Sequence, residues 1–490
     1  MGVARPRYRL GLVLTVLLLV AAGATGLWGC KGSQGDSPLT PQTPQGPARI
    51  TLDGSTRYQT IDGWAVLPRY WEEDKENNRF DGSFEAVAEP VSRFLVDQMG
   101  INAIRLQIPS GMENRTDRWG PFYRGEMSYL EYQEYRYEKF NDNNDPRSAD
   151  LTGFRFEQFD WRFETLVLPL IRALEARGEK LHINVCYVDF ARDASSAGTL
   201  SHAAQPEEFA EFVLVYFERL RDKYHITPDA FEVILEPENT HEWRGTSIGR
   251  ALVAVSNRLQ ERGFTPEIIA PSNTAMSNAI TYFDEMIKVP GVLGRLHTFA
   301  YHRYWTEKRS DVEAIRSRAL AHGLKTAMLE KVDAGIDALL EDLTVGQVSS
   351  WQQWAAAGTT RIPDNGGYYL RVDAGNAASP GISLARHSHQ LAQVFLYVRR
   401  GAVRIGSRSD KPDQTTAAFI NPDGRWVVVV RAGEADGQLT VRGLPAGRYG
   451  LRFTSDSHAR LEPAPITIAQ GAVLSTAVPG AGVLTIYGMK

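Results

Sequence analysis

Cysteine is scarce in this sequence: 490 residues contain only two, Cys30 and Cys186. A disulfide framework is therefore excluded, and the fold has to be stabilised by its hydrophobic core, which a chain of this length can supply. Cys186 lies in the apolar run 182–188, where we expect a buried thiol and not a reactive one. An excess of positive charge is also missing, since the formal net charge is −4 at pH 7. This mildly acidic balance argues against a nucleic-acid partner.

Several motifs of nucleophilic and cofactor-dependent enzymes are missing too. The sequence has no Gly-x-Ser-x-Gly elbow, and no glycine-rich phosphate loop follows the first expected strand. His241-Glu242 lacks the second histidine of a zinc-protease helix, and we expect His387 and His389 to be surface residues. The acidic run 142–145 lacks the spacing of a known calcium loop and is expected to be a solvated loop. We therefore expect neither a cofactor nor a metal.

The N-terminus has the three-part order of an export signal. Arginines precede the apolar run 10–20, and small residues follow it. Residues 27–30, Leu-Trp-Gly-Cys, resemble a bacterial lipobox, although Trp28 stands where a small residue is usual. We expect residues 1–30 to be a signal peptide and Cys30 to carry a lipid anchor for the membrane. The protein would then be an extracytoplasmic lipoprotein of the cell envelope, at the outer membrane or the cell surface.

Two other interpretations of the N-terminus stay open. Cleavage near residues 22–24, Ala-Gly-Ala, would release a secreted protein. Residues 10–28 are about long enough to remain as a membrane-spanning anchor. Residues 31–47 are rich in Pro, Gly, Ser and Gln, which cannot form a core, so they are predicted to be a disordered linker to the working domain.

From residue 48 to residue 386, short apolar runs alternate with longer amphipathic stretches such as 207–223 and 248–262. This alternation predicts parallel β-α-β units. The runs expected to be strands are residues 61–66, 101–108, 181–188, 231–235, 267–270, 296–301, 326–329 and 347–354. Eight such units predict an α/β fold, a (β/α)8 TIM barrel, with a doubly wound open sheet as the alternative.

Two segments depart from this alternation. Residues 111–160 are rich in Tyr, Glu, Asn and Asp and follow the second expected strand, so they are predicted to form an insertion at the rim and to act as a substrate lid. In residues 387–490 the helical pattern stops, and short apolar runs are separated by Gly, Pro and Asp turns. This predicts a C-terminal antiparallel β-sandwich domain, to which residues 48–52 are expected to add a strand.

Two glutamates follow the ends of expected strands. Glu236 follows the strand at 231–235 and precedes Pro237, and Glu330 follows the strand at 326–329. The C-terminal ends of barrel strands carry the chemistry, and the fourth and seventh strands lie across the barrel mouth from each other. A retaining glycosidase holds two carboxyl groups about 5–5.5 Å apart, one as acid and one as nucleophile. Close carboxylates push their pKa values apart, so that one stays protonated while its partner is ionised.

Short motifs accompany this pair in a fixed order along the chain. They are residues 59–64 on the first strand, Arg105 on the second, Glu236-Pro237 on the fourth, His302-Arg303-Tyr304 on the sixth, Glu330 on the seventh, Trp351 and Trp354 on the eighth, and 400–405 with 419–424 in the sandwich. Over about residues 55–490 the sequence resembles clan A glycoside hydrolases, and most of all glycoside hydrolase family thirty. The resemblance implies a barrel joined to a β-sandwich, a carbohydrate substrate, Glu236 as acid/base and Glu330 as nucleophile.

Further site residues are expected around the pair. Arg105 and His302 would orient Glu330, and Tyr304 would donate a hydrogen bond to it. The aromatic residues expected to stack on sugar rings are Trp64, Trp243 and Trp351.

One departure from the family pattern bears on function. The clan usually has asparagine before the acid/base, where it binds the sugar 2-hydroxyl, but this chain has Leu235. Glu238 or Asn239 in the following loop would have to take over that contact. The primary prediction is an exported retaining glycoside hydrolase acting on an extracellular polysaccharide or glycoconjugate. Two alternatives remain, a catalytically inactive, surface-tethered carbohydrate-binding protein and a structural surface protein that attaches through its sandwich.

Overall fold

The computed structural model describes residues 47–191, 193, 196–433, 437–455 and 460–489. The predicted signal peptide with Cys30, and residues 31–46 of the predicted linker, lie outside these residues. Within the described part of the chain, no helix has the length and apolar character needed to cross a membrane.

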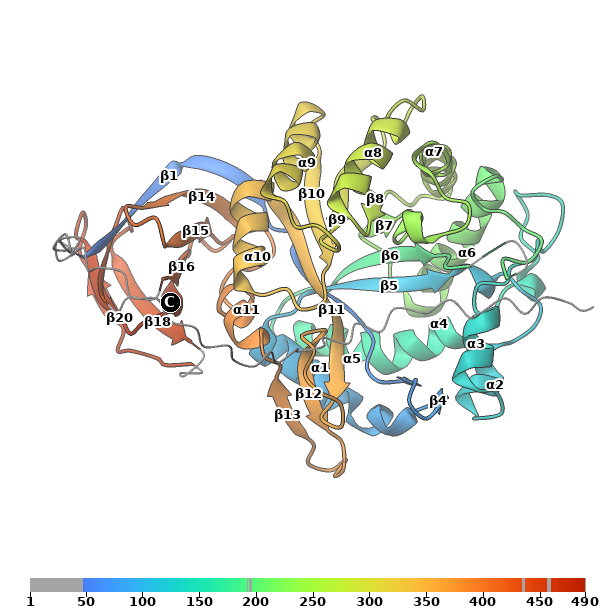
Figure 1. Cartoon of the computed structure of the whole chain (residues 1–490), viewed down its shortest axis with the longest axis horizontal. Helices are drawn as coiled ribbons and strands as arrows, with labels where there is room; N and C mark the ends of the chain where they lie inside the picture. Colours follow the sequence, from blue (N-terminus) through green and yellow to red (C-terminus); the bar gives the residue numbers. More distant parts are fainter. Residues whose placement is uncertain (1–46, 192, 194–195, 434–436, 456–459, 490) are drawn as a thin grey trace, which may run out of the picture. The chain divides into compact units, whose positions relative to one another are not determined.

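Eight parallel strands form a closed barrel (Figure 1). In pairing order they are β2 (Gly63–Leu67), β5 (Ala103–Pro109), β6 (His182–Val188), β7 (Ala230–Glu232), β8 (Glu267–Asn273), β9 (Leu296–His302), β10 (Lys325–Glu330) and β11 (Val348–Thr359). The barrel closes because β11 pairs with both β10 and β2. Each strand predicted from the sequence overlaps one of these eight, so the predicted TIM barrel is confirmed and the open-sheet alternative is wrong.

Helices connect successive barrel strands and cover them. They are α1 (Ala88–Phe94), α5 (Leu168–Glu175), α6 (Pro206–Tyr224), α7 (Gly245–Glu261), α8 (Met276–Met286), α9 (Arg309–Ala321) and α10 (Ile336–Glu341). Helix α6 shows why these stretches become helical: proline occupies its first position, acids its first turn and bases its last turn. These residues match the free N–H groups and the dipole at the two helix ends.

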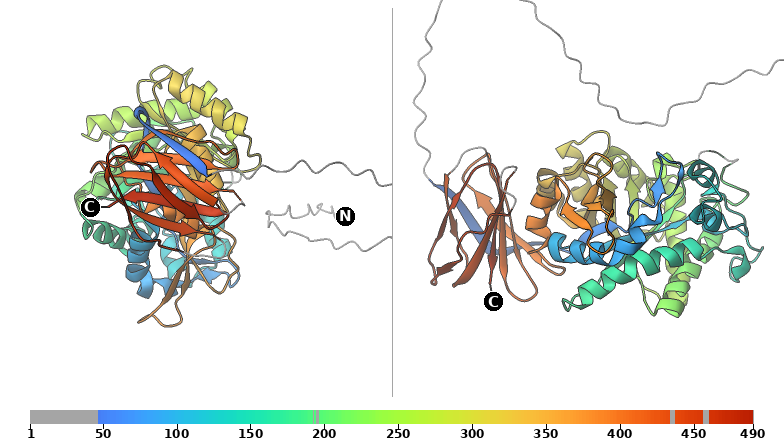
Figure 2. Two further views of the ribbon diagram at one scale, coloured as in Figure 1. Left: turned by 90° about the vertical axis from the view of Figure 1, so that its left-hand side faces the viewer. Right: turned by 90° about the horizontal axis from the view of Figure 1, so that it is seen from below.

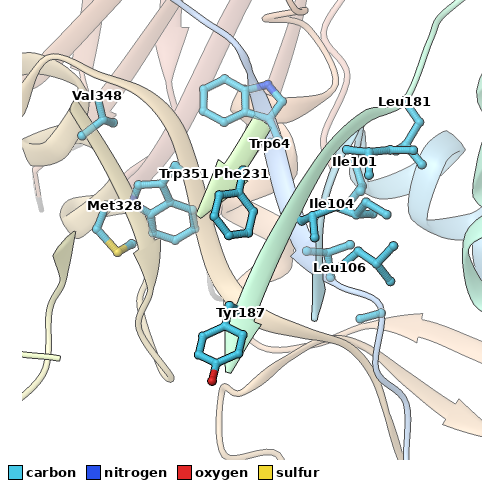
Figure 3. Packing of buried hydrophobic residues seen from close by; sticks show 14 of the residues in the cluster. Trp64, Ile101, Ile104, Leu106, Leu181, Tyr187, Phe231, Met328, Val348 and Trp351 are labelled. Atoms are coloured by element: carbon cyan, nitrogen blue, oxygen red, sulfur yellow. The ribbon is translucent and has the colours of Figure 1, made fainter. Parts of the chain in front are cut away.

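The core contains large aromatic side chains from two neighbouring barrel strands (Figure 3). Trp64 on β2 and Trp351 on β11 are both fully buried, and the ring of Trp64 stacks on Phe395 at 4.6 Å between centroids. Phe395 belongs to helix α11 (Ser388–Phe395), which lies beyond the predicted end of the helical pattern at residue 387. The helix forms there because its apolar face packs against the barrel. This is a tertiary contact, which the local sequence pattern cannot indicate.

The insertion after β5 contains the short helices α2 (Trp119–Tyr123), α3 (Tyr129–Tyr135) and α4 (Glu157–Arg162). An aromatic cluster that includes Trp119, Phe122 and Tyr132 stabilises it. The expectation of a solvated loop at 142–145 is wrong for its first residue, because Asp142 is buried. Its carboxylate accepts hydrogen bonds from neighbouring loop amides and so turns inward.

The sandwich is built from one strand that precedes the barrel and eight that follow it. They are β1 (Ala48–Thr60), β14 (Val403–Ser409), β15 (Thr415–Ile420), β16 (Trp426–Ala432), β17 (Gly437–Arg442), β18 (Gly447–Thr454), β19 (Ile466–Ile468), β20 (Leu474–Val478) and β21 (Gly482–Gly488). Strand β1 pairs with β14 and β17, as expected for residues 48–52 (Figure 2). All neighbours are antiparallel except β1 and β17.

Strand β16 contributes side chains to both hydrophobic clusters, that of the sandwich and the large one that includes the barrel. Val428 and Val430 point into the sandwich core, whereas Val427 and Val429 belong to the large cluster that includes the barrel core. Successive side chains of a strand point to opposite faces, so a run of four valines is buried on both sides. At the edge of the barrel, β12 (Tyr368–Asp373) and β13 (Gly381–Leu384) extend the sheet from β11, and the sequence did not predict them.

Candidate active site

The two predicted carboxylates meet at the C-terminal end of the barrel strands. Glu330 is the last residue of β10, and Glu236 follows β7 in a left-handed conformation with φ 48° and ψ 59°. The backbone N–H of Glu236 donates to the carbonyl of Ser272 at 3.0 Å, which fixes this turn. Carboxylate oxygens of Glu236 and Glu330 and a ring nitrogen of His302 all lie within 4.8 Å of one another. The arrangement therefore has the carboxylate separation of a paired acid and base.

Glu330 is held by two donors, one on each carboxylate oxygen. The Arg105 guanidinium donates to Oε2, and the Tyr304 hydroxyl donates to Oε1 at 3.2 Å. The Tyr304 oxygen itself accepts the backbone N–H of Val332 at 3.1 Å, so its own proton points at the glutamate. The guanidinium and the hydroxyl thus hold the side chain of Glu330 in one orientation.

Glu236 has a different environment. It accepts one hydrogen bond from the Asn239 amide, 3.0 Å from Oε2, and its Oε1 lies 2.9 Å from Nδ1 of His302. Burial raises the pKa of Glu236 to about 7, against the opposing effects of Arg105 and of the hydrogen bond from Asn239. The side chain thus carries a proton in weakly acidic solution and is about half protonated near pH 7, whereas its neighbour is paired with a cation.

His302, which was expected to orient Glu330, contacts Glu236 and Arg105 instead, and its ring is neutral. Burial lowers its pKa to about 4, although Glu330 opposes this effect. The guanidinium of Arg105 lies 3.4 Å from its Nε2, and a guanidinium can only donate. Nε2 is therefore the acceptor, and the ring proton sits on Nδ1, from where it donates to Glu236.

Glu232 is a site residue that the sequence analysis missed. It lies within β7, fully buried, 3.8 Å from the Arg105 guanidinium, and it accepts a hydrogen bond from Asn184 at 2.9 Å. Arg105 therefore stands between two carboxylates, Glu232 and Glu330. An acid in the middle of an apolar strand was the signal that could have identified it.

The three tryptophans predicted to stack on sugar rings are corrected by the structure. Trp64, Trp243 and Trp351 are each 0 % exposed, so no sugar can reach their faces. Their indole N–H groups donate inward, to the carbonyl of Val398, to Asp189 and to Asp342, respectively. A tryptophan that was not predicted is open to solvent instead. Trp305 follows Tyr304 directly and is 71 % exposed.

Glu238, predicted to contact substrate, is placed elsewhere. Its carboxylate accepts the backbone N–H of Ala275 at 3.1 Å and the amides of Asn273 and Asn278, so it anchors the start of α8. Leu235 is buried in an apolar cluster with Tyr137 from the insertion. Of the two proposed substitutes for the missing asparagine, Asn239 alone contacts the catalytic pair.

Comparisons with known proteins agree with this architecture. Residues 401–486 match the family model of the glycosyl hydrolase family 30 beta sandwich domain. No curated protein matches the sequence significantly.

Solved structures of similar fold extend over the barrel as well. The catalytic domain of GH30 xylanase C from Talaromyces cellulolyticus is 15 % identical, with a TM-score of 0.62 over 90 % of this chain and 100 % of that one. An endo-β1,6-glucanase is 16 % identical, with a TM-score of 0.61 over 90 % and 94 %. A conserved exported protein from Bacteroides fragilis is 14 % identical, with a TM-score of 0.64 over 89 % and 99 %.

The fold is thus that of a TIM barrel joined to a β-sandwich. The resemblance to glycoside hydrolase family 30 inferred from the motifs is confirmed by the sandwich match and by the shared fold.

Proposed function

We propose that the protein is a retaining glycoside hydrolase that cleaves O-glycosidic bonds of an extracellular polysaccharide or glycoconjugate. The observation that carries the proposal is the pair of unlike carboxylates: Glu236 and Glu330 lie within 4.8 Å of each other, one protonated by burial and the other paired with Arg105. Inverting enzymes keep their carboxyl groups about 6.5–9.5 Å apart to leave room for a water molecule. The shorter separation favours direct attack by the enzyme.

In the first step Glu330 attacks the anomeric carbon. A bond forms between its carboxylate oxygen and this carbon while the glycosidic C–O bond breaks, and Glu236 gives its proton to the departing oxygen. Glu236 is then ionised next to the neutral His302, whose Nδ1–H stabilises the new charge.

In the second step a water molecule takes the place of the departed sugar. Glu236 removes a proton from this water, the oxygen attacks the anomeric carbon, and the ester bond to Glu330 breaks. Glu236 regains its proton, and the product keeps the anomeric configuration of the substrate. No cofactor enters either step.

Two observations support a polysaccharide as the substrate class, namely the solved structures of similar fold and the residues at the rim. Those structures include a xylanase and an endo-β1,6-glucanase, which favours a polysaccharide. The exposed Trp305, next to Tyr304, offers a face for a sugar ring. Because Leu235 cannot bind a 2-hydroxyl, we propose that Asn239 makes the polar contact on that side.

We expect turnover of a β-linked polysaccharide or aryl β-glycoside with retention at the anomeric carbon. The purified protein would be screened on a panel of such substrates, and the first product would be followed by proton NMR before mutarotation. If the first product has the anomeric configuration opposite to that of the substrate, the double displacement is excluded.

A catalytically inactive carbohydrate-binding protein is the second candidate, and Leu235 is the observation that favours it. It predicts sugar binding by calorimetry without turnover of any substrate in the panel. The retained Arg105, Tyr304 and His302 contacts weigh against it, because a binding protein has no need to tune two carboxylates differently.

The location of the protein is a separate proposal. We propose that residues 1–30 direct export and that Cys30 is lipid-modified, so that the linker at 31–47 tethers the catalytic domains to the cell envelope. Mass spectrometry of the N-terminal peptide tests this, and an unmodified N-terminus near residue 24 would show a secreted protein instead.

The pH dependence of kcat/KM should show the titration of Glu236. Its pKa of about 7 means that the acid loses its proton, and the enzyme its activity, as the pH rises through about 7. Asn239→Ala removes a hydrogen bond that favours the ionised form, so this limb of the profile should move to higher pH. Asn278→Ala, whose amide contacts Glu238 instead, is the matched control and should leave the limb in place. If the alkaline limb of the pH profile stays in place in Asn239→Ala, Glu236 is not the acid whose titration is observed.

A further inference from the structure

Three buried acids lie close together outside the catalytic pair. Asp142 comes from the insertion, and Glu208 and Glu211 lie one turn apart on α6. The three side chains offer carboxylate oxygens that all lie within 4.8 Å of one another. Their residues are only 6 %, 8 % and 2 % exposed, so water screens their mutual repulsion poorly.

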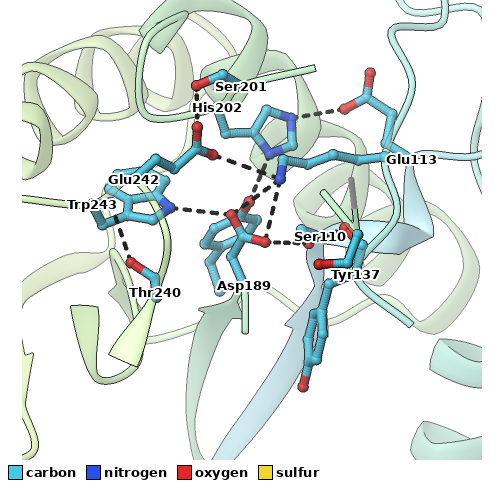
Figure 4. Close-up of polar contacts among 12 residues, drawn as sticks. Ser110, Glu113, Tyr137, Asp189, Ser201, His202, Thr240, Glu242 and Trp243 are labelled. Carbon is cyan, nitrogen blue, oxygen red and sulfur yellow. Dashed lines mark hydrogen bonds and ion pairs between the residues drawn. The ribbon is translucent and has the colours of Figure 1, made fainter. Parts of the chain in front are cut away.

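The basic side chains of this region have other partners. Lys139 is fully buried, and its Nζ lies 3.2 Å from Asp189 and 3.6 Å from Glu242. Figure 4 shows Asp189 at the centre of this network, with Ser110, Trp243 and Glu242 around it. Lys139 therefore already serves two acids.

The same holds for the arginine on the neighbouring helix. Arg258 donates to the carbonyl of Pro146 at 2.6 Å and to Glu207 at 3.2 Å. Across the described residues, no lysine, arginine or histidine forms an ion pair with Asp142, Glu208 or Glu211 within 4 Å. Three acids are thus buried together without a paired cation.

Individual oxygens of this cluster also lack partners. Oε2 of Glu208 and Oε1 of Glu211 are buried and have no hydrogen-bond donor, and the same is true of Oδ1 of Asn141. The Asn141 amide is oriented by its NH2 group, which donates to Glu208 Oε1 at 3.4 Å. Buried acceptors without donors are costly, and several in one place call for a positively charged ligand.

The electrostatics agree with the geometry. Glu113 is a further buried acid of this region, and its Oε2 lies 2.9 Å from Nε2 of His202. His202 is neutral, because burial lowers its pKa to about 3. The histidine therefore adds no positive charge to this region (Figure 4).

We propose that Asp142, Glu208 and Glu211, with the amide oxygen of Asn141, form a binding site for a calcium ion. Two ligands on opposite sides of one Ca²⁺ lie up to roughly 5 Å apart, and the carboxylates meet this limit. An all-oxygen set with three carboxylates suits Ca²⁺ better than Mg²⁺, which takes one or two carboxylates and keeps several waters. Sulfur and imidazole ligands, which transition metals prefer, are absent from the set.

The site joins the insertion to the barrel. Asp142 lies five positions after Tyr137, which packs in one cluster with Leu235 beside the acid/base. A calcium ion bridging Asp142 to α6 therefore fixes the loop that forms this wall of the active site. Binding to the folded state alone also stabilises that state.

The test uses the full-length protein after chelation and dialysis. Addition of 1 mM CaCl2 should raise the unfolding temperature by roughly 3–6 °C, and calorimetry should show one bound ion. Glu211→Gln should lose this response. In the chelated state it should unfold at the same or a higher temperature than the wild type, because one of the clustered charges is gone. Glu207→Gln on the same helix, whose carboxylate contacts Arg258 outside the cluster, should respond like the wild type.

Two outcomes would overturn the proposal. An unfolding temperature that calcium leaves unchanged, with no heat of binding, would mean that the acids are simply protonated. An equal response to MgCl2 would overturn the assignment to calcium. Neither readout involves sugar turnover, so the calcium site and the proposed glycosidase activity fail independently.

Discussion

Replacing Glu330 by glutamine should abolish hydrolysis, with kcat/KM falling by roughly four orders of magnitude or more. The amide has the shape of the carboxylate but cannot form the ester with the anomeric carbon. It also takes a negative charge away from Arg105, which then keeps only Glu232 as its acidic partner at 3.8 Å. Initial rates on the best substrate of the panel measure the effect.

The control for this variant separates chemistry from folding. Glu313→Gln, on the exposed face of α9, removes a carboxylate that contacts only Arg309 and should keep full activity. Both variants should give the wild-type circular dichroism spectrum. Sugar binding that survives in Glu330→Gln would show that the site is intact. Turnover within tenfold of the wild type would mean that Glu330 is not the nucleophile.

Replacing Glu236 by glutamine should have an effect that depends on the leaving group. For a polysaccharide or an alkyl glycoside, the departing oxygen needs a proton, so kcat/KM should fall by about 10²- to 10⁴-fold. For an aryl glycoside whose phenol is a strong acid, the first step needs little protonation, so the loss should be much smaller. The limb of the pH profile near 7 should disappear in this variant.

A series of aryl glycosides with phenols of increasing pKa makes this quantitative. The slope of log kcat/KM against leaving-group pKa should be steeper for Glu236→Gln than for the wild type. Glu238→Gln is the matched control, since Glu238 lies two residues away and anchors α8. A uniform loss across the series in Glu236→Gln would reveal a positioning role and not proton donation.

The barrel could be predicted from the sequence because its signals are local. Each strand is buried on both faces, so it stands out as an apolar run, and each helix between strands has an amphipathic pattern. The catalytic pair followed from the same reasoning, since Glu236 and Glu330 come directly after two such runs.

Side-chain environments could not be predicted in this way. Trp64 and Trp351 lie on barrel strands and Trp243 precedes α7, but whether a ring faces solvent or core depends on neighbours far along the chain, such as Phe395 beside Trp64. The partners of Arg105 and the buried acids around Asp142 likewise come from separate elements. Burial of a charged group is a tertiary property, and a lone acid in a sequence does not reveal it.

The sandwich has a consequence for how the chain is synthesised. Its strand β1 leaves the ribosome first, whereas β21, at Gly482–Gly488, leaves last and takes a central place between β16 and β18. The eight barrel units are consecutive and can assemble one after another, but the sandwich has to wait for β21. Until then β16 and β18, the two neighbours of β21, present unpaired edges, which are sites for aggregation and proteolysis. A chain that stops before β21 would therefore keep these edges open, although Arg105, Glu236 and Glu330 have already been made.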